Sequence, residues 1–151
     1  MKKLLILCAG IALFSACKKD EKDNKSASEH LTAAKWMVES GSLRMQGPGV
    51  DTTENLFEGA EACDMDDVWS YTSDFKYTIS EGATKCDPSN PDVSDQGVWT
   101  LINNNSKLVI VSTDGYADTA DINVLNGSTF QISSKEVDDD YTYTYSIKFK
   151  H

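Results

Sequence analysis

The stretch Tyr141–Lys150, YTYTYSIKFK, decides the fold class of this 151-residue chain. Large apolar side chains occupy every second position, and small polar or basic residues stand between them. This period of two is typical of a β-strand with one face in the core and the other toward solvent. The acidic run Asp138–Asp140 indicates a turn, and Thr129–Val137 before it is again strand-like. The end of the chain is therefore predicted to be an antiparallel hairpin.

Similar segments recur upstream, separated by turn signals. Asn126-Gly127 and Asn103–Asn105 mark tight turns, and Gly41 is a candidate β-bulge. A short helical turn is expected over His30–Ala34. The predicted strands are, in chain order, Lys35–Met45, Asp67–Thr72, Phe75–Ser80, Gly97–Ile102, Lys107–Ser112, Tyr116–Leu125, Thr129–Val137 and Tyr141–Lys150.

Strands joined by successive hairpins favour an up-and-down antiparallel arrangement. Eight of them can close into a barrel whose interior is filled by side chains or holds one small ligand, and a sandwich is the alternative. A filled core and a ligand cavity both remain open, although buried tyrosine hydroxyls need partners and so favour a small amphipathic ligand. The candidate interior or ligand-lining aromatic residues are Trp36, Trp69, Tyr71, Tyr77, Trp99, Phe130, Tyr143 and Tyr145.

Residues 1–16 are predicted to be a secretory leader. Met1–Lys3 is basic, and the apolar run Leu4–Ala16 has 13 residues, fewer than the ~20 needed for a transmembrane helix. The segment Phe14–Cys17, FSAC, resembles the lipobox of bacterial lipoproteins. This resemblance implies cleavage before Cys17 and a lasting membrane anchor of two or three acyl chains on it. An ordinary leader that leaves a free Cys17 is the alternative.

Residues 17–29 are predicted to be a disordered tether, and residues 30–151 the folded domain. The tether carries no large apolar residue and therefore cannot bury a core of its own. Lys19–Glu21 resembles the export signal of some Gram-negative lipoproteins, with a generic charge run as the alternative. We therefore expect attachment to the outer membrane with exposure at the cell surface.

The cysteines support an oxidising compartment. Cys8 leaves with the leader and Cys17 takes the lipid, so Cys63 and Cys86 remain as a pair. We predict a disulfide between them, because a redox or metal pair would need a CxxC spacing or a nearby histidine. The disulfide would join the two long connections of the chain, Gln46–Asp66 and Gly82–Gln96.

Composition argues against several classes of function. The chain has 14 Lys and Arg against 24 Asp and Glu, a formal net charge of -10, which disfavours nucleic acids as partners. His30 and His151 stand at the edges of the domain, which leaves little for a histidine-activated nucleophile. The acidic clusters Asp64–Asp67 and Asp138–Asp140 lack the spacing of an EF-hand loop and are interpreted as solvated turns. We predict no enzymatic activity, no cofactor and no metal.

Several segments together resemble the lipocalin-like domain family of bacterial lipoproteins: LTAAKWMVES at Leu31–Ser40, Cys63-Asp64 followed by DDVWSY at Asp66–Tyr71, EGATKCDPSNP at Glu81–Pro91, and GVWTL at Gly97–Leu101. The resemblance covers residues 31–150. It implies a small eight-stranded barrel with Trp36 in its first strand and a Cys63–Cys86 pair. Ala34 and Phe75 stand where glycine is common in such domains.

The sequence thus predicts a monomeric, membrane-anchored extracytoplasmic lipoprotein whose barrel binds a small apolar or amphipathic ligand. The alternative is a non-enzymatic interaction module that contacts a partner protein or glycan through Gln46–Asp66 and Gly82–Gln96. A deep pocket lined by Tyr and Trp would favour the first hypothesis.

Overall fold

The computed structural model describes residues 24–151, so the leader, Cys17 and most of the predicted tether lie outside the described residues. The described chain forms two short helices and nine strands. In chain order they are α1 (Ala27–Thr32), β1 (Lys35–Gly47), β2 (Val50–Asn55), α2 (Ala62–Met65), β3 (Val68–Tyr71), β4 (Lys76–Ser80), β5 (Val93–Ile102), β6 (Lys107–Ser112), β7 (Ala117–Leu125), β8 (Phe130–Asp138) and β9 (Tyr141–Lys150). None of the described helices is both long and apolar enough to cross a bilayer.

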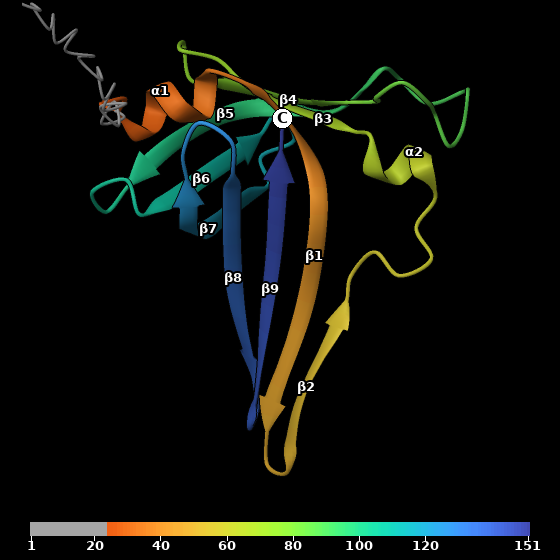
Figure 1. The fold of residues 1–151 in the computed structure, drawn as a ribbon, viewed down its shortest axis with the longest axis vertical. Helices are drawn as coiled ribbons and strands as arrows, with labels where there is room; N and C mark the ends of the chain where they lie inside the picture. The colour runs from red at the N-terminus through yellow and green to blue at the C-terminus, as the bar shows by residue number, and fades with distance from the viewer. Residues whose placement is uncertain (1–23) are drawn as a thin grey trace, which may run out of the picture.

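Eight of the strands, β1 and β3 to β9, close into an antiparallel barrel (Figure 1). Each strand from β3 onward pairs with the next along the chain. β1 closes the circle because it pairs with β3 over Lys35–Met37 and with β9 from Met37 to Gln46. The predicted up-and-down barrel is confirmed, and the sandwich alternative is wrong.

A projecting sheet continues beyond the barrel. β2 pairs with the second half of β1, from Ser42–Asn55 to Gly47–Val50, and β8 and β9 extend alongside (Figure 1). The prediction that Gln46–Asp66 is an open connection was therefore wrong. The β2 sequence VDTTEN has no alternation of apolar residues, and almost all of its side chains are exposed. Its pairing with β1 is therefore what makes it a strand.

Other boundaries also differ from the prediction. β5 begins at Val93 rather than Gly97, because its first residues pair with the end of β4. The bulge in β1 falls between Val38 and Ser40, not at Gly41. Gly41 stays in register and accommodates the Phe57 ring, since a Cβ at this position would lie 2.5 Å from Phe57 Cε2.

Helix α1 begins at Ala27 rather than at His30, inside the segment predicted as tether. A capping box explains the earlier start: Glu29 N–H donates to Ser26 Oγ at 3.2 Å, and Ser26 N–H donates to the Glu29 carboxylate at 2.7 Å. The fully buried Leu31 joins the helix to the barrel core, and its carbonyl accepts a hydrogen bond from Trp36 Nε1 at 3.0 Å. We call the end of the barrel that α1 covers the helix end.

Aromatic side chains fill the helix end. Trp36, Phe130 and Phe149 are fully buried. The centroids of the Trp36 and Phe130 rings are 5.6 Å apart, and those of Phe130 and Phe149 are 5.0 Å apart in a stacked arrangement. Because aromatic rings bury large apolar areas, this packing contributes much of the core at this end.

Candidate binding cavity

The predicted interior aromatic residues divide into three groups. Trp36, Tyr71, Tyr77, Trp99 and Phe130 are buried. Trp69 and Tyr145 are half-buried and line a cavity. Tyr143 lies farther along β9, opposite Glu136 in the projecting sheet, and is not among the residues that line the cavity.

The cavity occupies the part of the barrel away from the helix end. Its volume is about 110 Å³, and it is partly open to solvent. Aliphatic side chains of modest size, such as Leu108 and Ile132, leave this space where the helix end has bulky rings. The lining residues are Trp69, Tyr71, Leu108, Ile110, Asp118, Ala120, Ile132, Ser133, Ser134, Tyr145 and Ile147.

Few polar groups interrupt the apolar lining. Asp118 is exposed at the start of β7 and marks the mouth, whereas Tyr71 and Leu108 are only 3% and 4% exposed and form the floor. Sequence reasoning did not single out Asp118 or Ala120. The signal was available, because both alternate with the inward-facing Ile122 along β7.

Tyr71 and Tyr77 lie side by side but differ in their hydrogen bonding. Their ring centroids are 6.5 Å apart, and their planes differ by 35°. The Tyr77 hydroxyl donates to Asp95 Oδ2 at 2.7 Å. The buried Tyr71 hydroxyl has no hydrogen-bond partner among residues 24–151. Burial raises the pKa of Tyr71, so its phenol stays protonated and can donate.

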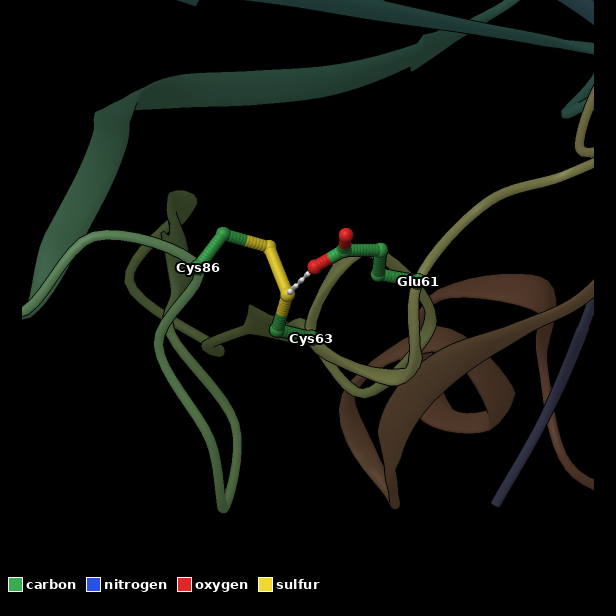
Figure 2. Close-up of side chains that lie close together, drawn as sticks. All are labelled: Glu61, Cys63 and Cys86. Atoms are coloured by element: carbon green, nitrogen blue, oxygen red, sulfur yellow. Dashed lines mark hydrogen bonds between the residues drawn. A yellow bond between two sulfur atoms is a disulfide. The ribbon is translucent and has the colours of Figure 1, made fainter.

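The predicted disulfide is present. It joins Cys63 of α2 to Cys86 in the β4–β5 connection, with a Cα–Cα distance of 5.3 Å (Figure 2). The Glu61 carboxylate points toward Cys63 and lies 3.7 Å from its Sγ (Figure 2). A disulfide sulfur carries no proton, so this approach is a contact rather than a hydrogen bond. Since both sulfurs are bonded to each other, these three residues offer no thiolate to a metal.

The acidic cluster near α2 organises the adjoining connection. Asp66 Oδ2 accepts hydrogen bonds from the Thr84 N–H and hydroxyl, each at 2.9 Å. Partial burial of Asp67, together with the nearby carboxylates of Glu81, Asp66 and Asp64, raises the pKa of Asp67. The second cluster, Asp138–Asp140, forms the predicted β8–β9 turn, with Asp139 at a positive φ of 51°.

A closed barrel with one filled end and one apolar cavity defines the class of small, ligand-binding β-barrels. The profile of the lipocalin-like domain family matches residues 32–132, more than half of the chain. The chain belongs to the lipocalin-like domain family, as its sequence segments predicted. A search of curated proteins found no match.

Proposed function

We propose that this chain is a membrane-anchored extracytoplasmic lipoprotein whose barrel binds a small apolar or amphipathic ligand. The cavity carries the binding part of this proposal. Its lining is mainly aliphatic and aromatic, with a small number of polar side chains, as is typical of ligand pockets. The proposal includes no enzymatic activity, because barrels of this family are generally binding folds.

The size of the cavity limits the ligand. A volume of about 110 Å³ compares with ~150 Å³ for an engineered protein cavity that takes up benzene. The enclosed part of the ligand is therefore about one ring or a short branched chain. The rest of a longer ligand would extend out of the mouth of the cavity, over Tyr145 and toward Tyr143 on the projecting sheet.

The membrane anchor is supported by the sequence. Phe14–Cys17 resembles a lipobox, and Lys19–Glu21 resembles a surface-export signal. On this proposal Cys17 holds a monomeric domain at the outer membrane, on the cell surface of a Gram-negative bacterium. The disulfide between Cys63 and Cys86 supports an oxidising compartment.

Native mass spectrometry of the protein from its own source tests the binding proposal. We expect a retained small molecule in the wild-type protein. Ala120→Phe, which fills the cavity from β7, should abolish retention, whereas Val98→Phe at a 52% exposed position should not. Circular dichroism of both variants checks that they fold. A wild-type protein that retains no small molecule would contradict the proposal. Retention that Ala120→Phe leaves unchanged would contradict it as well.

One observation favours the alternative, an interaction module. β2 is an edge strand of the projecting sheet, with β1 on one side and no other strand of the described chain paired with it. Such an edge can pair with an extended segment of a partner protein. Cross-linking from a photoreactive residue at Thr53 on whole cells tests this alternative, and capture of one defined partner would support it.

A further inference from the structure

We propose that the cavity selects a neutral ligand with a hydrogen-bond-accepting oxygen, and that the Tyr71 hydroxyl binds this oxygen at the cavity floor. The inference rests on the proposed ligand-binding function and adds the chemical class of the ligand. Alcohols, phenols, amides and ketones with a compact hydrocarbon body belong to this class.

Other buried Trp and Tyr side chains of the barrel donate a hydrogen bond. Trp36 Nε1 donates to the Leu31 carbonyl, Trp99 Nε1 donates to the Thr72 carbonyl, and the Tyr77 hydroxyl donates to Asp95. Tyr71 is 3% exposed and lines the cavity, yet its hydroxyl has no partner within residues 24–151. Buried hydroxyls without a partner are rare in folded proteins because they are costly. A ligand oxygen at the cavity floor would satisfy this donor.

The described residues that line the cavity offer no cation to a ligand. Among the lining residues, all within the described chain, Asp118 is the one ionisable carboxylate, and there is no Lys, Arg or His. The chain as a whole carries a formal net charge of -10. A carboxylate or phosphate group would therefore lose its hydration at the cavity floor without gaining a cation. This disfavours fatty acids and other anions as ligands.

The position of Tyr71 in the cavity sets the orientation of the ligand. Tyr71 and Leu108 form the floor, and Asp118 marks the mouth. An oxygen bound by Tyr71 enters first, and the hydrocarbon body then packs between Ile110 and Ile132. The volume of about 110 Å³ fits roughly one ring.

Four small probes test the selection. Toluene and phenol have the same size, and so do benzamide and benzoate. Each is titrated by NMR into the full chain carrying Cys17→Ala, so that no acyl chain competes for the cavity. We expect phenol to bind about threefold to tenfold more tightly than toluene, the effect of one neutral hydrogen bond. Benzoate should bind at least about tenfold more weakly than benzamide.

Variants assign the effect to one hydroxyl. Tyr71→Phe should abolish the preference for phenol and leave toluene binding unchanged. Tyr116→Phe, at a 72% exposed position outside the cavity lining, should leave all four affinities unchanged. Because the Tyr71 hydroxyl has no protein partner, Tyr71→Phe should also preserve the melting temperature of the free protein, whereas a large drop would overturn the inference.

The remaining outcomes separate the two proposals. If toluene binds but phenol binds no more tightly, or if benzoate equals benzamide, the inference fails and the ligand-binding function stands. If phenol keeps its advantage in Tyr71→Phe, the inference also fails. If none of the four probes binds, the ligand-binding function fails and the inference fails with it.

Discussion

Phe75 has a left-handed backbone, with φ 63°, a conformation that bulky residues rarely adopt. Its ring is 56% exposed but lies 5.3 Å from Trp99, centroid to centroid, and this contact offsets part of the strain. The other non-glycine residues in the described chain with positive φ are Asn103, Asn104, Asn105 and Asp139. Asn and Asp tolerate this conformation, which explains why the two corresponding turns were predictable and the conformation of Phe75 was less so.

Asn104 offers a clean test of this backbone conformation. It is exposed, with φ 56°, so a β-branched residue should be strained and glycine should not. We expect Asn104→Val to lower the free energy of unfolding by ~1–2 kcal/mol. Asn104→Gly should change it by less than ~0.5 kcal/mol. Urea denaturation measures both, and equal effects of the two substitutions would contradict the assignment.

Asp67 should give the protein a measurable pH dependence. Its pKa is raised in the folded state, mainly by burial and then by the neighbouring carboxylates. The folded protein therefore binds this proton more readily than the unfolded chain, and stability falls as the pH rises from the ordinary carboxyl range through the raised value. Asp67→Asn should stabilise the protein at neutral pH and have little effect at ~pH 3.

Asp74 serves as a control of opposite sign. Lys76 at 2.6 Å and Thr72 at 2.5 Å lower the pKa of Asp74, so its contribution is present at neutral pH and disappears as the pH falls through the lowered value. Asp74→Asn should therefore destabilise at neutral pH. Melting temperatures of both variants across the acid range check the two signs, and a parallel response would contradict this interpretation.

At the scale of elements, β1 organises most of the molecule. Its first residues pair with β3 and its remainder with β9, which closes the barrel, and its second half also carries β2. Phe57, in the connection that follows β2, packs on Gly41 of β1. This connection continues into α2, whose Cys63 joins it to the β4–β5 connection. The disulfide therefore fastens two excursions that no strand pairing holds together.

Removal of the disulfide should cost about 3 kcal/mol of stability, as chain-entropy estimates give for a closed loop of this length, since Cys63 and Cys86 have a sequence separation of 23. The double variant Cys63→Ser and Cys86→Ser should show this loss in urea denaturation. Dithiothreitol should reproduce it in the wild-type protein and have no effect on the double variant. Wild-type stability that does not respond to the reductant would contradict the prediction.

At the scale of the whole molecule, the barrel is asymmetric. Rings from Trp36, Phe130 and Phe149 fill the helix end, and the opposite end contains the cavity. The proposed anchor precedes α1 in the chain, so the membrane attachment and the domain that binds the ligand are separate parts of the molecule. Loss of the anchor should therefore change the location of the protein and not the fold of the barrel.

Cys17→Ala tests this separation. We expect the variant to leave the membrane fraction completely and to lose labelling by radioactive palmitate, while the melting temperature of the domain stays the same. Protease treatment of intact cells that express the wild-type protein then reports surface exposure. Unchanged membrane retention of the Cys17→Ala variant would contradict lipid anchoring.

The sequence by itself determined the strands with strong alternation, the turns at Asn103–Asn105 and Asp138–Asp140, the barrel class and the cysteine pair. These features are local, because period two and turn chemistry are written in neighbouring residues. Only the tertiary structure decided that β2 is a strand, that the helix end is filled, and that the buried Tyr71 hydroxyl has no hydrogen-bond partner within residues 24–151. Those outcomes depend on which distant strands meet in register, and the volume left between them is a property of the closed barrel rather than of any segment.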